Sequence, residues 1–174
     1  ADLPIQILPV AAITKRQQGK ELVDFAALKQ AGAVAFSEDG RSVADPKLMF
    51  RAMQKIKEID SFIIDHCETP ELACAEICSP EDETISELAE TTMVQREILL
   101  AEKTGVRLHL THLSLPESFA MVKSAKEAGL SVSCDITPHH LCLHNRLPTP
   151  SPPALAKVNP PLRKPEYLEK IYAF

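Results

Sequence analysis

The stretch FIIDHCE, residues 62–68, joins a short apolar segment to three side chains that are able to bind a metal ion. Residues 62–65 have the apolar character of a buried strand in a parallel sheet. His66, Cys67 and Glu68 follow directly. A single histidine at the end of a strand is more often a hydrogen-bonded polar residue than a ligand, so the interpretation depends on what the other strands carry.

The rest of the chain alternates segments of strand character with amphipathic segments. We expect strands at residues 6–12, 33–36, 62–65, 107–112 and 131–136, and helices at residues 20–32, 45–60, 79–105, 114–129 and 164–174. Pro46 after Asp45 is typical of a helix start, and Gly105 of a helix end. This repetition predicts an α/β fold with a parallel sheet and right-handed crossovers. Either an open doubly wound sheet or about five strands of a (β/α)8 TIM barrel fits, and the lack of a glycine-rich phosphate-binding motif weakens the first.

Composition excludes several classes of protein. A formal net charge of −5 argues against a nucleic-acid binder, and no apolar run approaches the ~18 residues of a membrane helix. The first residues lack the regions of a signal peptide. Five cysteines, an odd number, favour reduced thiols and a cytoplasmic location. Cys74 and Cys78 do not have a usual zinc-binding spacing.

Residues 137–165 differ from the rest of the chain in composition and periodicity. They contain eight of the fourteen prolines and no clear periodicity, which predicts a long loop excursion. Within it, residues 147–156 are typical of a stiff surface linker.

Three successive strands run into polar side chains of one chemical kind. The strand 33–36 leads to Glu38 and Asp39, the strand 62–65 to His66, and the strand after residue 107 to His112. In parallel α/β folds function gathers at the carboxyl ends of strands, and one carboxylate with two imidazoles suits a zinc-type ion. From the residues alone, a metal site and a set of ordinary polar strand ends remain equal alternatives, since Asp-Gly by itself favours a turn.

The remaining histidines are expected to have other roles. Strand alternation places His109 on the face opposite His112, toward the helices, so we expect it to be structural. His139 and His140 follow a proline in a turn, where supporting or packing roles are more common than ligation. His144 lies in the loop and is expected to be solvated.

The order of these motifs resembles that of bacterial class I dihydroorotases over residues 5–172. The segments that carry the resemblance are ITKRQQGKELVDFAALKQAGAVAFSEDG, IIDHCE, LHLTHLS, DITPHHL and KVNPPLR. The resemblance implies a binuclear zinc hydrolase of the amidohydrolase superfamily on a (β/α)8 barrel. Such enzymes interconvert N-carbamoyl-L-aspartate and L-dihydroorotate, small molecules of pyrimidine biosynthesis.

Site residues carry over position by position. Asp39 matches the catalytic carboxylate that bridges the two metals, and His66 and His112 match the histidines that hold the second zinc. Asn159 in NPPLR matches an asparagine that hydrogen-bonds the substrate. The family also implies a homo-oligomer or a partnership with aspartate transcarbamoylase.

The departures from the family pattern are also specific. The chain contains neither the H-x-H pair of the first strand nor the D-H-A-P-H motif of a late strand, and Glu38 replaces the first Asp of D-D-G. We therefore expect residues 1–174 to be the central part of a barrel domain, and to be inactive alone. Two alternatives stay open: a non-catalytic scaffold of aspartate transcarbamoylase, and a hydantoinase- or allantoinase-like enzyme. The lack of a lysine at the strand end speaks against the latter.

Overall fold

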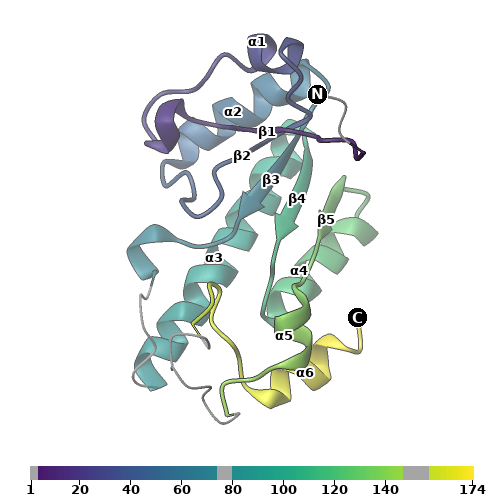
Figure 1. The fold of residues 1–174 in the computed structure, drawn as a ribbon. Helices are drawn as coiled ribbons and strands as arrows, with labels where there is room; N and C mark the ends of the chain where they lie inside the picture. Colours follow the sequence, from purple (N-terminus) through teal and green to yellow (C-terminus); the bar gives the residue numbers. More distant parts are fainter. Residues whose placement is uncertain (1–3, 74–79, 147–156) are drawn as a thin grey trace.

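Five parallel strands form one sheet in chain order, β1-β2-β3-β4-β5. The computed structural model describes residues 4–73, 80–146 and 157–174 (Figure 1). The strands are β1 Val10–Ala12, β2 Ala35–Ser37, β3 Phe62–His66, β4 Arg107–Thr111 and β5 Val132–Cys134. A doubly wound sheet reverses its strand order at one point, whereas a barrel sector does not. The sheet therefore has the topology of an incomplete barrel.

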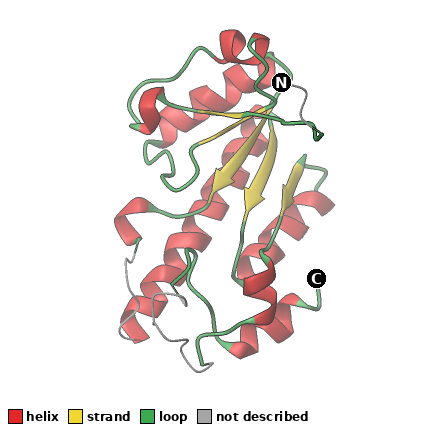
Figure 2. Ribbon diagram, in the orientation of Figure 1, coloured by secondary structure: helices red, strands yellow, loops and turns green. Residues whose placement is uncertain are grey.

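Within the described ranges, six α-helices and two 3-10 turns accompany the strands. The helices are α1 Phe25–Gln30, α2 Pro46–Glu58, α3 Pro80–Thr104, α4 Pro116–Glu127, α5 Pro138–Cys142 and α6 Pro165–Ile171, and the turns are η1 Lys15–Gln17 and η2 Pro70–Leu72. Helices α2, α3 and α4 lie behind the strands in Figure 2. The buried core forms between them, from strand residues that include Phe36, Ile63, Leu108, Leu110 and Val132.

Strand alternation assigns the opposite face of the sheet to the barrel interior. Because Ile63 and Leu110 face the helices, Ile64 and Thr111 face the other way, and both line a cavity there. The described helices leave this face uncovered.

The predicted helix ends are confirmed for α2 and α3. The Asp45 side chain accepts the backbone N–H of Lys47 at 2.8 Å, and Pro46 occupies the first helical position. Gly105 follows α3 with a φ of +68°, in the left-handed region that glycine tolerates. Ser79, the expected cap of α3, lies outside the described residues.

The predicted start of the first helix is wrong by five residues. Helix α1 begins at Phe25, with Asp24 as its cap, because residues 20–23 pair with the segment after β1. Thr14 and Leu22 form an antiparallel bridge, and the N–H of Val23 donates to the carbonyl of Ile13 at 3.1 Å. The backbone groups needed for an additional helical turn are thus used in a small hairpin.

The predicted loop excursion over residues 137–165 contains a helix, so that prediction is corrected in part. Thr137 caps α5, and buried His140 binds the Thr137 hydroxyl through Nδ1 at 2.6 Å and the Pro160 carbonyl through Nε2 at 2.8 Å. Burial lowers the pKa of His140, against the hydrogen bond to the Pro160 carbonyl, which acts to raise it. The ring packs α5 against the loop around the cis Asn159–Pro160 bond. Residues 147–156 lie outside the described part.

Cysteine state and membrane topology are described for the same residues. Cys67, Cys134 and Cys142 are free thiols, as expected, while Cys74 and Cys78 fall outside the described ranges. Within those ranges, no helix is long and apolar enough to cross a lipid bilayer.

Two buried carboxyl groups lie between the sheet and α3. Asp65 on β3 and Glu97 on α3 are fully buried, and one oxygen of each has no hydrogen-bond partner within the described part of the chain. Arg96 binds the other oxygen of Glu97. Burial raises the pKa of both groups, and for Asp65 the nearby Glu97 charge raises it further.

Replacing Glu97 with glutamine should therefore change how stability depends on pH. A folded-state pKa above the unfolded value means that the folded protein binds more protons, so stability is lost as pH rises from about 4.5 through the folded pKa. We expect the free energy of unfolding of Glu97→Gln, minus that of the native chain, to increase between pH 4.5 and 8. Urea titrations at several pH values measure both.

Glu102 on the same helix provides the matched control, because its side chain is half exposed. Glu102→Gln should follow the native pH profile. Parallel profiles for Glu97→Gln and the native chain would contradict the assignment of a buried, proton-binding carboxyl.

Candidate metal centre

The carboxyl ends of β2, β3 and β4 bring three candidate ligands together. The register pairs His66 with Thr111 at the ends of β3 and β4, and Ser37 at the end of β2 with Ile64, two residues before His66. Asp39 lies two residues beyond β2, and His112 directly follows β4. These two residues and His66 form the group, within the described part of the chain, that could hold a metal ion.

The distances among the three ligand atoms fit a tetrahedral ion. His66 Nδ1 lies 3.0 Å from His112 Nε2 and 3.6 Å from Asp39 Oδ1, and the last two atoms are 3.5 Å apart. Zinc–nitrogen and zinc–oxygen bonds of about 2.0–2.1 Å in a tetrahedron separate neighbouring ligand atoms by about 3.3–3.4 Å. The triangle therefore has the size, and its atoms the chemical types, that a zinc-type ion requires.

The backbone of His112 adopts a left-handed conformation that directs its ring toward Asp39 and His66. Thr111 faces the barrel interior, so simple alternation would turn His112 toward the helices. Instead, His112 has a φ of +44°, which is uncommon for a residue with a side chain and reverses that direction.

The same geometry corrects the prediction for His109. Leu108 and Leu110 belong to the core under the helices, so His109 between them faces the barrel interior. There its ring lies 2.9 Å from Ser133 Oγ and 2.9 Å from Asp135 Oδ2. The prediction failed because it extended strand alternation through His112, where the backbone leaves the strand conformation.

Glu68 fixes the ring of His66 in the form that a ligand needs. His66 Nε2 lies 3.1 Å from Glu68 Oε2, and because a carboxylate only accepts, Nε2 carries the proton. Nδ1 then presents its lone pair to Asp39 and His112. The hydrogen bond from His66 lowers the pKa of Glu68, against the effect of burial, and a hydrogen bond from Asn159 lowers it further. Such a carboxylate–histidine pair is the usual support of a metal-ligating imidazole.

Asn159 reaches the site through the same carboxylate. Its Nδ2 donates to Glu68 Oε2 at 3.2 Å, although the two residues are 91 positions apart. The structure thus places all four predicted site residues, Asp39, His66, His112 and Asn159, in one hydrogen-bonded neighbourhood.

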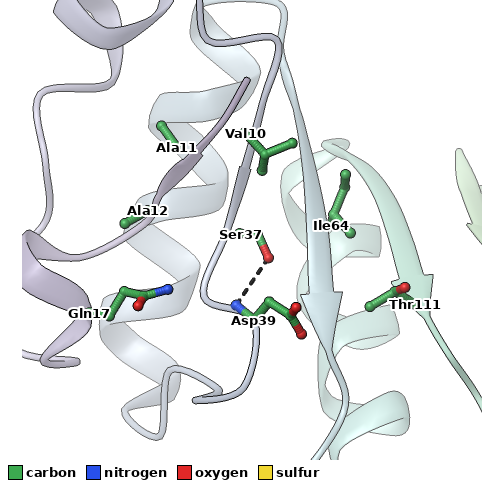
Figure 3. Close-up of a pocket in the computed structure, with 8 residues that line it drawn as sticks. All are labelled: Val10, Ala11, Ala12, Gln17, Ser37, Asp39, Ile64 and Thr111. Atoms are coloured by element: carbon green, nitrogen blue, oxygen red, sulfur yellow. Dashed lines mark hydrogen bonds between the residues drawn. The ribbon is translucent and has the colours of Figure 1, made fainter. Parts of the chain in front are cut away.

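A cavity of about 290 Å³ opens on the barrel-interior face beside Asp39 (Figure 3). Its lining comes from the neighbouring strands and from η1: Val10, Ala11, Ala12, Gln17, Ser37, Asp39, Ile64 and Thr111. The backbone N–H of Asp39 donates to Ser37 Oγ at 3.1 Å. The Asp39 side chain is 67% exposed, so one edge of the carboxylate is open to the cavity.

Glu38 has a structural function that the sequence analysis did not find. Its buried carboxylate accepts the backbone N–H groups of Ile13 and Thr14, each at 3.0 Å, and the Thr14 hydroxyl. Glu38, which directly precedes Asp39, is therefore hydrogen-bonded to the residues that follow β1. The only available signal was an acidic residue directly after an apolar strand, which is also typical of a turn.

Comparisons with known proteins show the family to which the chain is similar. A family model described as Dihydro-orotase-like matches residues 2–118. The chain is 41% identical to the dihydroorotase of Geobacillus sp. (strain WCH70), over 96% of this chain and 40% of that protein, and 41% identical to the dihydroorotase of Anoxybacillus flavithermus, over 93% and 39%. The chain thus spans about two-fifths of the length of these relatives.

Solved structures resemble the chain in fold. The L-hydantoinase (dihydropyrimidinase) of Arthrobacter aurescens superposes with a TM-score of 0.72 at 21% identity, covering 94% of this chain and 39% of that one. The dihydropyrimidinase of Brevibacillus agri gives 0.69 at 17%, covering 85% and 36%. The predicted fold class, an incomplete (β/α)8 barrel of about five strands, is confirmed.

Removing both histidines should abolish metal binding. We expect the native chain to bind about one zinc ion after gel filtration, because three suitable ligand atoms form one complete face of a tetrahedron. The double variant His66→Ala, His112→Ala should bind none, as measured by elemental analysis.

The control is His144→Ala, since His144 lies outside the site and its Nδ1 accepts the backbone N–H of Arg146. This variant should retain its zinc. Equal zinc content in the native chain and the double variant would refute the ligand assignment.

Proposed function

Since the chain belongs to the dihydro-orotase-like family, we propose that it is the metal-binding central part of a zinc-dependent dihydroorotase. The reaction is the reversible ring closure of N-carbamoyl-L-aspartate to L-dihydroorotate in pyrimidine biosynthesis. Ring closure joins the ureido nitrogen to the side-chain carboxyl carbon with loss of one water, and the reverse reaction adds that water to the cyclic amide.

The observation that carries the proposal is the convergence of Asp39, His66 and His112 at three adjacent strand ends. A bound zinc pair would polarise the amide carbonyl and supply a nucleophile that is strong at neutral pH. Such chemistry requires carboxylate and neutral imidazole ligands, and these three side chains supply both.

Each residue of the site has a proposed role that its surroundings support. His66 and His112 would hold one ion, with the lone pair of His66 directed by Glu68. Asp39 lies close to both imidazoles and has a mostly exposed side chain, and it would hold metal together with the two histidines. Asn159, which donates to Glu68, would hydrogen-bond a substrate at the edge of the proposed metal site.

A hydantoinase-like activity has weaker support. The hydantoinase structures share the fold at 17–21% sequence identity, and a shared fold at this identity does not indicate a shared substrate. The lysine that a hydantoinase-like enzyme was expected to carry at the strand end is absent from the ends of β2, β3 and β4, which offer Asp39 and two histidines. The non-catalytic scaffold is disfavoured by the intact geometry of all three ligands.

Assembly and location remain predictions. A homo-oligomer or a complex with aspartate transcarbamoylase would follow from the family, and light scattering with and without that enzyme would detect either. The free thiols of Cys67, Cys134 and Cys142 are compatible with a cytoplasmic protein.

A chimera tests the proposed reaction directly. The matched region of the Geobacillus dihydroorotase, 174 aligned residues, is replaced by this chain, so that the remaining three-fifths of that protein is supplied. We expect the chimera to open L-dihydroorotate, and the same chimera with Asp39→Ala to lose both its zinc and its activity. Ring opening is followed by loss of ultraviolet absorbance.

Hydantoin and dihydrouracil serve as competing substrates in the same assay. A folded chimera that carries zinc and opens hydantoin in preference to dihydroorotate would overturn the proposed substrate. A zinc-loaded chimera that opens none of the three would favour the scaffold alternative.

A further inference from the structure

Asp135, directly after β5, surrounds the backbone of His112 with hydrogen bonds. Its N–H donates to the carbonyl of Leu110 at 3.2 Å, and its carbonyl accepts the N–H of Leu113 at 3.0 Å. Its carboxylate accepts the N–H of His112 and the hydroxyl of Thr111, the latter at 3.2–3.3 Å. One residue thus contacts every position from 110 to 113.

The backbone of His112 needs such support. A left-handed φ of +44° is unfavourable for a residue with a Cβ, and persists only where the surroundings impose it. In this conformation the N–H of His112 no longer continues the β4–β5 ladder through a carbonyl, so it requires another acceptor. The Asp135 carboxylate is that acceptor.

His109 holds the carboxylate in place. Its Nε2 lies 2.9 Å from Asp135 Oδ2, and its Nδ1 lies 2.9 Å from Ser133 Oγ. Ser133 and His109 both face the barrel interior, and together they orient the oxygen that does not bind His112.

We propose that Asp135, oriented by His109, is a positioning residue that holds the left-handed backbone of His112 and so aims its imidazole at the metal site. The part of this inference that concerns metal rests on the proposed function. The part that concerns the backbone does not, because it follows from hydrogen bonds present without an ion. Asp135 itself is not a ligand: its carboxylate faces the backbone of His112, whereas the ring faces Asp39 and His66.

Two substitutions separate positioning from general stability. Asp135→Ala removes the acceptor of His112, while Asp135→Asn keeps an oxygen for it and presents an amide to His109, which can accept after a change of tautomer. We expect Asp135→Ala to weaken zinc binding about 10–100-fold, the usual effect of losing a residue that orients a ligand, and Asp135→Asn to restore most of it. Zinc affinity is measured by competition with a chelating dye.

Amide hydrogen exchange in the metal-free chain provides the second measurement. The His112 N–H should exchange on the order of tenfold faster in Asp135→Ala than in the native chain, and at nearly the native rate in Asp135→Asn. The N–H of Leu108 is the internal reference, since it donates to Ser131 at the other end of β4 and should not change. Ser133→Ala, which removes only the second contact of His109, is the matched control and should have a small effect on both measurements.

The outcomes distinguish this inference from the proposed function. Native zinc affinity in folded Asp135→Ala, or unchanged exchange of the His112 amide, would overturn the positioning role and leave the proposed function standing. If the native chain binds no zinc, the proposed metal site fails, and the exchange measurement alone decides whether Asp135 holds His112. Equal acceleration at His112 and Leu108 would show general loosening of β4 and would also overturn it.

Discussion

The parallel register of β2, β3 and β4 is the constraint on which the site depends. Consecutive strands that pair in parallel must end at the same edge of the sheet, and the pairing of Ser37 with Ile64 and of His66 with Thr111 sets the level at which they end. Residues 27 and 46 positions apart in the chain are thereby brought within 3–4 Å. The buried core between sheet and helices includes Phe36 and Val132 and fixes that register. A shift by one residue would move the apolar side chains of a strand from the core to the opposite face.

A carboxylate supports the strand end beside each candidate ligand. Glu38, next to Asp39, accepts a backbone N–H from the residue that follows β1. Glu68 sets the tautomer of His66, and Asp135 accepts the backbone N–H of His112. Each of these acids is satisfied by hydrogen bonds from protein groups, which leaves Asp39 as the carboxylate directed at both imidazoles. The division between supporting and binding carboxylates explains how an acidic neighbourhood can present a defined metal site and not a diffuse cluster of charge.

Sequence reasoning found the features that have a local signal. Apolar runs predict the strands, a helix cap predicts the start of α2 at Asp45, and the polar residues that directly follow strands indicate the three candidate ligands. It failed where the determinant was a contact across the fold. Because Leu22 pairs with Thr14, α1 begins later in the chain than predicted. Because His112 has a left-handed backbone, the strand alternation that was used to place His109 does not hold. Neither Glu38 nor Asp135 could be recognised as a support, because their partners lie more than twenty residues away.

The most direct test of the account is the position of zinc in a crystal of the zinc-loaded chain, located by anomalous scattering at the zinc edge. We expect a peak about 2.0–2.2 Å from His66 Nδ1, His112 Nε2 and Asp39 Oδ1, with the left-handed backbone of His112 retained. A peak bound by cysteine sulfur elsewhere, or an imidazole of His112 turned toward the helices, would contradict it.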